Sequence, residues 1–207
     1  MLKNANKRPY LGKNRPKNTK IRPKMQKMHA EHDASDNLRF RRVLVRMCFS
    51  GAENAMQYLI DKYQLVPHPE GGFYREVFRS QHAVHSAAGH KRNAVTHIYF
   101  LLAKGEVSRF HKVIHDEVWN FYEGDPLMLI RYDGRSIREE LIGRTCDEYA
   151  SVVEGGTFQA AETSGEYSLV GCTVAPGFQF EDFSFLSHDA AACKKIKAQH
   201  PEYSRFV

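Results

Sequence analysis

The sequence GEVSRFHKVIHDEVWNFYEG, residues 105–124, decides the predicted fold. Gly105 and Gly124 bound it, and alternating apolar residues on both sides of its centre indicate two consecutive β-strands. His111 falls on the first of these strands and Glu117 on the second. An imidazole and a carboxylate on neighbouring strands predict a polar site inside a β-structure.

Side chains two residues apart in a strand point to the same face of the sheet. Arg109 should therefore share a face with His111, and Trp119 should share one with Glu117. If His111 and Glu117 point inward, they meet in a largely apolar cavity of the kind that binds small molecules. The spacing alone leaves a second reading open, in which both are surface residues near a turn.

The rest of the chain extends this β pattern. A helix should run from about residue 51 to 63, opened by a capping box at Ser50, and a second helix should run from about 190 to 200. Between them, runs with a period of two predict strands at residues 73–80, 94–102, 107–114, 118–122, 127–132, 136–142, 157–161, 168–174 and 180–186. Many short strands with Gly and Asp turns indicate an antiparallel sandwich or barrel.

Positive charge is concentrated at the N-terminus. Residues 1–50 contain 14 Lys and Arg against 3 Asp and Glu, whereas residues 51–207 contain 16 against 21. We therefore predict a basic, disordered arm over residues 1–50 and a single domain over residues 51–207. Residues 1–30, which contain no acidic residue, could be a nuclear address, a mitochondrial presequence, a nucleic-acid-binding arm or a tail without function.

The four cysteines are far apart and form no CxxC pair, which is typical of a reduced intracellular protein. No apolar run has the length of a membrane span, and the N-terminus lacks the apolar segment of a secretory signal. The expected location is the cytoplasm, with the nucleus or the mitochondrion as alternatives through the basic arm.

Four motifs together resemble one family, the cupins of domain of unknown function 985. They are HPEGGFYRE at residues 68–76, YFLL at 99–102, DEVWNFYEGDPL at 116–127 and VGCTVAPGFQFEDF at 170–183. The resemblance covers about residues 54–200. It implies an all-β double-stranded β-helix, the RmlC-like jelly roll, which is commonly dimeric and has a polar pocket.

The cupin motifs also bear on metal binding. Their first motif has a second histidine where this chain has Val113, and their second motif has a histidine where it has Gln159. Because a divalent transition metal usually needs three good protein ligands, we expect no metal cofactor. If a metal did bind, its ligands would be His111, Glu117 and Gln159.

A more distant likeness suggests a reaction. Residues 71–76 are similar to a segment of the deoxythymidine-diphosphate-sugar epimerases, cupins without a metal, in which a His base and a Tyr acid exchange protons. The likeness implies His111 as the base, with Glu117 or Asp182 as its orienting carboxylate. Glu76 keeps its place in the segment, whereas Tyr74 replaces a Phe and Gly71 replaces an Arg that helps to hold the nucleotide sugar.

Three functions remain open on the sequence. The first is a metal-independent epimerase or isomerase that acts on a sugar- or nucleotide-type ligand, with His111 and Glu117 as catalytic residues. The second is a cupin that binds a small polar ligand without chemistry, and the third is a metal-dependent cupin enzyme. The expected ligand-binding residues are Tyr74, Glu76, Arg109, Trp119, Gln159 and Asp182.

Overall fold

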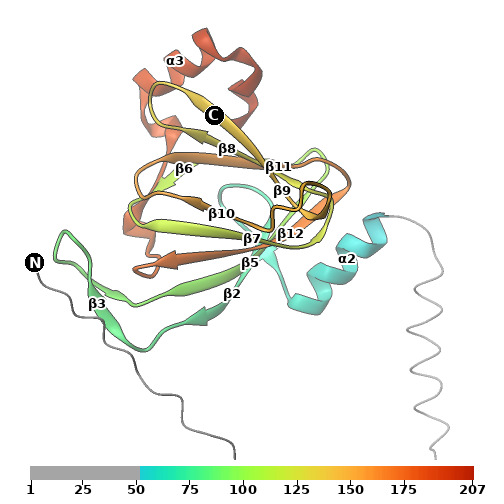
Figure 1. The fold of residues 1–207 in the computed structure, drawn as a ribbon, viewed down its shortest axis with the longest axis horizontal. Coiled ribbons are helices and arrows are strands. Elements are labelled where there is room, and N and C mark those ends of the chain that lie inside the picture. The colour runs from blue at the N-terminus through green and yellow to red at the C-terminus, as the bar shows by residue number, and fades with distance from the viewer. Residues whose placement is uncertain (1–51) are drawn as a thin grey trace, which may run out of the picture. The chain divides into compact units, whose positions relative to one another are not determined.

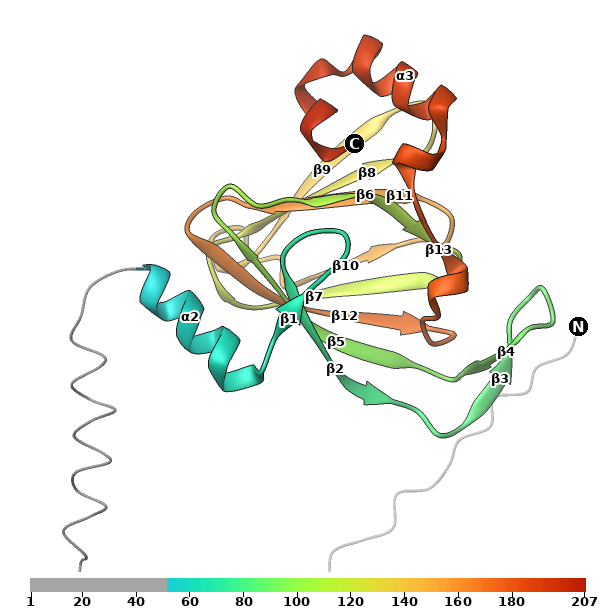
Figure 2. The same cartoon turned by 180° about the vertical axis from the view of Figure 1, so that it is seen from behind.

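The computed structural model describes residues 52–207. The predicted basic arm and Ser50, the predicted helix cap, lie outside the described residues. In the described part of the chain, two antiparallel sheets face each other without closing into a barrel, as Figures 1 and 2 show from opposite sides. This arrangement confirms the predicted double-stranded β-helix.

The larger sheet has six strands in the order β1-β2-β5-β12-β7-β10. These strands are β1 (Val66–Pro67), β2 (Phe73–Arg79), β5 (Thr96–Ala103), β12 (Tyr167–Ala175), β7 (Asp116–Gly124) and β10 (Ala150–Val153). The smaller sheet has five strands in the order β13-β6-β11-β8-β9. They are β13 (Phe183–Phe185), β6 (Ser108–Val113), β11 (Phe158–Thr163), β8 (Leu127–Tyr132) and β9 (Ile137–Ile142). A separate hairpin consists of β3 (Ala83–His85) and β4 (Lys91–Asn93).

Both predicted helices are present. The first, α2 (Ala52–Tyr63), packs Leu59 against Leu101 and Leu169 on the outer face of the six-stranded sheet. The second, α3 (Ala190–Gln199), begins at Asp189, whose carboxylate accepts a hydrogen bond from the Ala192 N–H. Four short 3₁₀ helices complete the described chain: η1 (Arg144–Cys146), η2 (Phe180–Asp182), η3 (Leu186–His188) and η4 (Pro201–Phe206).

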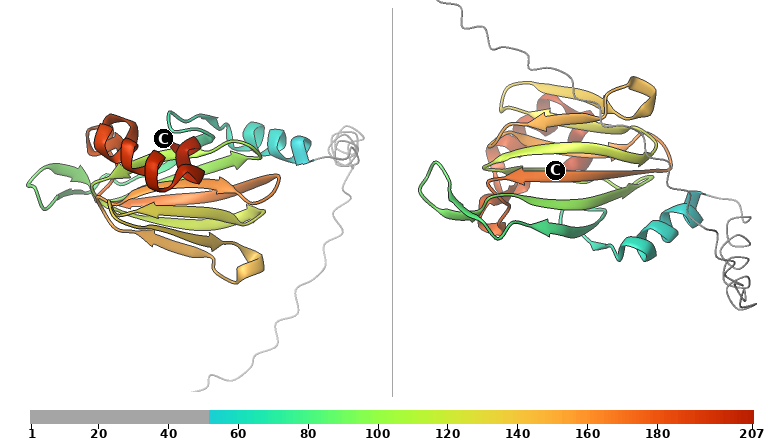
Figure 3. Two further views of the ribbon diagram at one scale, coloured as in Figure 1. Left: turned by 90° about the horizontal axis from the view of Figure 1, so that it is seen from above. Right: turned by 60° about the horizontal axis from the view of Figure 1, so that its bottom comes forward.

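The C-terminal helices cover the outer face of the five-stranded sheet. Phe110 and Ile130 from this sheet pack with Ile196 of α3 and Phe206 of η4. In the right-hand view of Figure 3 these helices lie behind the strands, while the six-stranded sheet faces the viewer. The two sheets thus differ in how their outer faces are covered.

Apolar residues fill only part of the space between the sheets. Trp119 and Val170 belong to a buried cluster with Leu127 and Leu129, and this cluster closes one end of the sandwich. Toward the other end, Glu117 on β7 and Val174 on β12 line a cavity. Because β7 and β12 pair in register there, with Val174 opposite Glu117, one pair of strands supplies both the core and the cavity wall.

The predicted strands agree with the observed ones to within a few residues, with one difference near the C-terminus. There the predicted strand 180–186 is the short helix η2 followed by β13. Four short strands were not predicted: β1, β3, β4 and β10. They are two to four residues long, which is too short for an alternating pattern to be recognised.

Candidate functional site

The cavity between the sheets has a volume of about 140 Å³. Its lining comes from five strands, β2, β5, β6, β7 and β12, from the loop before β2 and from the segment around η2. The polar and charged side chains that line it are His68, Glu70, Tyr74, Glu76, Arg79, Thr96, His111, Glu117, Cys172 and Gln179. Ile98, Val113, Val174, Phe178, Phe180 and Phe183 supply the apolar part.

His111 lies in the cavity lining and is only 2% exposed. Its Nδ1 is 2.8 Å from the carbonyl oxygen of Arg109, so the orienting group of the ring is a backbone carbonyl, and neither Glu117 nor Asp182. The ring is stacked on Phe183, with 5.2 Å between centroids and 20° between planes. These contacts fix the ring with its Nε2 edge toward the other polar groups of the cavity.

The predicted position of Arg109 in the cavity is wrong. His111 is paired with Gln159 and Ser108 with Ala161, so β6 has one more residue than β11 between these pairs. This β-bulge reverses the alternation of side chains. As a result Ser108 and His111 are both buried, while Arg109 is exposed and donates a hydrogen bond to the Pro69 carbonyl at 2.6 Å.

The loop before β2 brings Glu70 into the site, which the sequence analysis did not predict. Gly71 has a φ of +115°, and a Cβ there would lie 2.1 Å from the Val107 carbonyl oxygen. The loop therefore lies close to β6, and the Arg109 N–H donates to the Glu70 carbonyl at 2.9 Å. The Glu70 side chain is only 6% exposed, and its Oε2 is 3.2 Å from Nε2 of His111.

Gln159 contacts both His111, which is on its own sheet, and Glu117, which is on the facing sheet. The Gln159 amide nitrogen is 2.5 Å from Oε2 of Glu117 and 3.1 Å from Nε2 of His111. On its other side, the Gln159 amide oxygen accepts a hydrogen bond from Nε1 of Trp119 at 2.9 Å. The structure therefore brings these four predicted residues together, with Trp119 and Gln159 behind the cavity lining.

Burial dominates the electrostatics of this group. It raises the pKa of Glu70 to about 8, against the hydrogen bond from Ser108 and the charge of Arg109. Burial also lowers the pKa of His111, an effect that the charge of Glu117 opposes. The pKa of His68 falls to about 4 through burial and the nearby His111. The histidines are therefore held in the neutral form at neutral pH.

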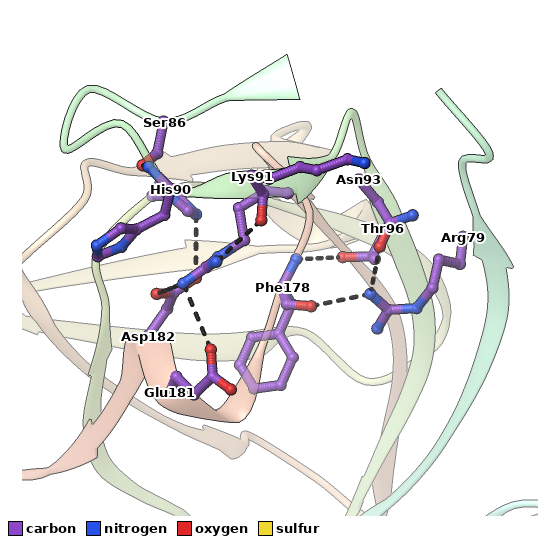
Figure 4. Close-up of polar contacts among 11 residues, drawn as sticks. Arg79, Ser86, His90, Lys91, Asn93, Thr96, Phe178, Glu181 and Asp182 are labelled. Carbon is purple, nitrogen blue, oxygen red and sulfur yellow. Dashed lines mark hydrogen bonds and ion pairs between the residues drawn. The ribbon is translucent and has the colours of Figure 1, made fainter. Parts of the chain in front are cut away.

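Tyr74 and Glu76 lie on β2 and line the cavity, as predicted for ligand-binding residues. Tyr74 meets the ring of His68 edge-on, with 4.5 Å between the ring centroids. Glu76 pairs with Arg79 through two contacts of 2.9 and 2.7 Å. The Arg79 guanidinium also donates to the Asn93 side chain and to the Phe178 carbonyl, both at 3.1 Å, and Figure 4 shows the latter contact.

Asp182 is buried but does not belong to the cavity lining. Its two oxygens accept hydrogen bonds from Nε and Nη2 of Arg92 at 2.6 and 2.7 Å, and these bonds hold the β3–β4 hairpin against η2. The Arg92 guanidinium lowers the pKa of Asp182. Figure 4 shows the Asp182 and Glu181 side chains next to the hairpin residues His90 and Lys91. The structure thus gives Asp182 a structural contact in place of the predicted contact with a ligand.

The donor set does not fit the metal site that the resemblance to cupins implies. Val113 lines the cavity without a donor atom, and the amide oxygen of Gln159 is already bound by the Trp119 N–H. The Gln159 group that faces His111 and Glu117 is therefore its NH₂, which is not a metal ligand. Within residues 52–207, no group of three or more His, Cys, Asp and Glu side chains is arranged to hold a metal ion.

The fold and the polar cavity between its sheets define a cupin. The chain matches the family described as Cupin superfamily (DUF985) over residues 57–186, and it belongs to this family. An uncharacterized protein of Saccharomyces cerevisiae is 30% identical over 152 residues, which are 64% of this chain and 76% of that protein.

Two solved structures share the fold. A hypothetical protein from Leishmania major has a TM-score of 0.63 and 31% identity, and the match covers 73% of this chain and 95% of that one. A protein from Shewanella oneidensis has a TM-score of 0.60 and 32% identity, with 71% and 90% of the two chains covered. In the part of this chain that the structure describes, the helices are too short or too polar to cross a membrane.

Proposed function

We propose that the protein is a metal-independent enzyme of the isomerase or epimerase class, which moves protons on a small polar ligand of the sugar type. The observation that carries this proposal is the contact of 3.2 Å between Glu70 and His111 in the cavity lining. Two titratable groups with shifted pKa values in one cavity are typical of a site for acid–base chemistry.

The charges of the cavity favour an uncharged ligand over a nucleotide diphosphate. Arg79 is the only Lys or Arg side chain in the cavity lining that the structure describes. Its guanidinium is engaged by Glu76, Asn93 and Phe178, so little positive charge is left to bind a diphosphate. A sugar-type ligand fits the lining better, since it can pack its C–H face on Phe180 and direct its hydroxyls toward Glu70 and Glu117.

Hydrogen exchange at carbon tests this function before a product is known. The protein is incubated in D₂O with neutral aldoses and ketoses, sugar phosphates and nucleotide sugars, and proton NMR follows the C–H next to the carbonyl. We expect exchange with at least one neutral sugar-type compound, and a loss of at least about 100-fold in His111→Asn. His85→Asn, on an exposed strand of the hairpin, is the matched control and should keep the rate.

The same panel of compounds distinguishes an enzyme from a protein that only binds its ligand. Thermal stabilisation by a compound whose C–H bonds never exchange would support a cupin that binds its ligand without chemistry. Exchange that requires added divalent ions would instead support a metal-dependent enzyme. Either result would overturn the proposed function.

A homodimer, which the resemblance implies, stays a prediction. The surface that we propose for it is the outer face of the six-stranded sheet, which carries Phe78, Tyr122 and Val152. These side chains are 53%, 43% and 50% exposed. A second copy that packs on this face would bury them and leave the cavity accessible, because the cavity is lined by the inner face of the same sheet.

A further inference from the structure

The directions of the hydrogen bonds behind the cavity are fixed by Trp119. Its indole N–H can only donate, so the Gln159 atom at 2.9 Å from it is the amide oxygen. The Gln159 NH₂ group must then point the other way, toward Glu117 and His111. An NH₂ group only donates, so both of these partners accept a hydrogen bond.

These directions leave His111 neutral. Its Nδ1 lies 2.8 Å from the Arg109 carbonyl, which is an acceptor, so the ring proton is on Nδ1. Its Nε2 then carries a lone pair, which accepts from the NH₂ of Gln159 at 3.1 Å. A proton on Nε2 would point at the hydrogens of the Gln159 NH₂ group, and two donors would then oppose each other. His111 is therefore a neutral imidazole with both nitrogens engaged.

Glu70 faces two such lone pairs. Its Oε1 accepts from the Ser108 hydroxyl at 3.0 Å, while its Oε2 lies 3.2 Å from Nε2 of His111 and 3.6 Å from Nδ1 of His68. Nδ1 of His68 also carries a lone pair, because it accepts from the backbone N–H of Glu70 at 3.3 Å. An ionised Oε2 would face two acceptors, whereas a protonated Oε2 donates to one of them.

Glu117 has the opposite surroundings. It accepts from the Gln159 NH₂, and the Cys172 thiol also hydrogen-bonds to it. Burial raises the pKa of Glu117 and an ionised Glu70 would raise it further, whereas these two hydrogen bonds lower it. Two donors therefore favour the ionised form of Glu117, while Glu70 has one donor and two acceptors.

The charged and titratable groups around Glu70 come from three other parts of the fold besides its own loop. His68 lies in that loop, Arg109 and His111 come from β6, Glu117 comes from β7 and Cys172 comes from β12. Arg109 is exposed, and its guanidinium points to the Pro69 carbonyl. It therefore opposes protonation of Glu70 only weakly, and burial still raises the pKa of Glu70 to about 8.

From this geometry we infer that Glu70 is held as the neutral acid and Glu117 as the carboxylate base of the site, with Gln159 as the positioning residue that donates to Glu117 and to His111. This inference rests on the proposed function and moves the base from His111 to Glu117. It makes Glu70 a catalytic residue, because Glu70 and Glu117 both line the cavity that would hold the ligand.

The two carboxyl groups balance an isomerisation without any further reactant. Glu117 takes the proton from the carbon next to the ligand carbonyl, and the C–H electron pair forms a C=C bond. The carbonyl π electrons move to the oxygen, which takes the proton of Glu70. Glu117 then returns its proton to the former carbonyl carbon or to the other face of the same carbon, and a hydroxyl group of the enediol returns a proton to Glu70, so both groups are regenerated with no net change in charge.

NMR on the protein without ligand tests this assignment. With ¹³Cδ-labelled Glu, we expect one carboxyl signal that titrates near pH 8 and is absent in Glu70→Gln. The signal absent in Glu117→Gln should have the ionised shift at a pH at which the Glu70 signal is still protonated. The ¹⁵N shifts of His111 should show a protonated Nδ1 and a free Nε2 from pH 6 to 8. Glu148→Gln, at an exposed site, is the matched control and should leave all these signals unchanged.

A Glu70 signal that is already ionised at pH 6, or a His111 ring protonated on both nitrogens at pH 7, would overturn the inference. If Glu70→Gln does not fold, infrared spectra of the unmodified protein decide the question. A protonated carboxyl band at pH 7 that disappears above pH 9 supports it, and the absence of such a band contradicts it. If the protonation states are as expected but no compound of the panel exchanges hydrogen, the proposed function is wrong while the assignment of Glu70 and Glu117 stands.

Discussion

Oε2 of Glu70 lies 3.2 Å from Nε2 of His111, although the two residues belong to different parts of the fold. Glu70 is in the loop before β2, and His111 is on β6 of the five-stranded sheet. Both side chains are buried, and both line the cavity between the sheets. The contact therefore depends on how closely this loop packs against β6.

Gly71 allows that close packing, so we predict that Gly71→Ala displaces the loop. A Cβ would lie 2.1 Å from a backbone oxygen, and the φ of +115° adds strain. We expect a loss of at least about 2 kcal/mol in the free energy of unfolding, measured by urea denaturation, together with loss of ligand binding. Gly89→Ala, with a φ of +80° and no atom within 4 Å of the added Cβ, should cost only about 1 kcal/mol and leave binding intact. Equal effects of the two substitutions would contradict this role for the loop.

The protonation of Glu70 should be visible in the pH dependence of stability. A carboxyl with a pKa of 4.5 when unfolded and about 8 when folded binds more protons in the folded state between these values. Its contribution to stability is therefore greatest below about pH 4.5 and falls as the pH rises to 8, by at most about 1.4 kcal/mol per pH unit.

Glu70→Gln removes this titration. We therefore expect the variant to gain stability relative to the unmodified protein as the pH is raised from 5 to 8, in guanidinium denaturation at each pH. Glu148→Gln, at an exposed position, should show a constant difference. A constant difference for Glu70→Gln as well would show that Glu70 is ionised in the folded protein throughout this range.

The hydrogen bond between Trp119 and Gln159 should couple the two residues energetically. Trp119→Phe leaves the buried amide oxygen of Gln159 without its donor, and we expect it to destabilise the fold by about 2–4 kcal/mol. In a double-mutant cycle with Gln159→Met, which removes the amide, the two losses should add to more than the loss in the double variant. Strictly additive losses would mean that the hydrogen bond does not orient Gln159.

The sequence predicted Asp182 as a ligand-binding residue, and a substitution can test this prediction against the structural contact. Because its carboxylate binds Arg92 and lies outside the cavity lining, Asp182→Asn should loosen the β3–β4 hairpin without a direct effect on the ligand. We expect faster amide hydrogen exchange in residues 82–94 and a ligand affinity within about 3-fold of the unmodified protein. A loss of affinity of 10-fold or more would return Asp182 to the ligand-binding residues.

The proposed dimer surface can be tested at Tyr122. Tyr122→Glu places a charge on the outer face of the six-stranded sheet, where Tyr122 is 43% exposed. A dimer that uses this face should dissociate, and light scattering at fixed protein concentration should then report a monomer. Tyr58→Glu, on α2, replaces a tyrosine that is 58% exposed and should leave the dimer intact. If the unmodified protein is itself a monomer, the prediction of a dimer is wrong.

The sequence predicted most of the strands from their alternation, and it offered an inward position of His111 and Glu117 as one of two possibilities. It placed Arg109 wrongly because the bulge in β6 inserts one residue, and a bulge leaves no mark on a period of two. It missed Glu70 because loop residues have no period at all. The glycine pair at 71 and 72 was the available signal, since both have a positive φ and allow a loop to lie close to a strand.

Trp119 and Gln159 illustrate a further limit of the sequence. Both were predicted as ligand-binding residues, but the direction of the Gln159 amide depends on a contact between side chains 40 residues apart. That contact decides whether an oxygen or an NH₂ group faces His111. The chemistry of the cavity therefore became clear only in the folded structure.

A crystal structure with a compound from the exchange panel tests the central claim most directly. We predict that a carbonyl or hydroxyl oxygen of this compound lies within hydrogen-bond distance of Glu70, and that the exchanging carbon lies next to the Glu117 carboxylate. The ligand ring should pack on Phe180. A compound bound outside this cavity, or one held through a metal ion on His111, would contradict the account.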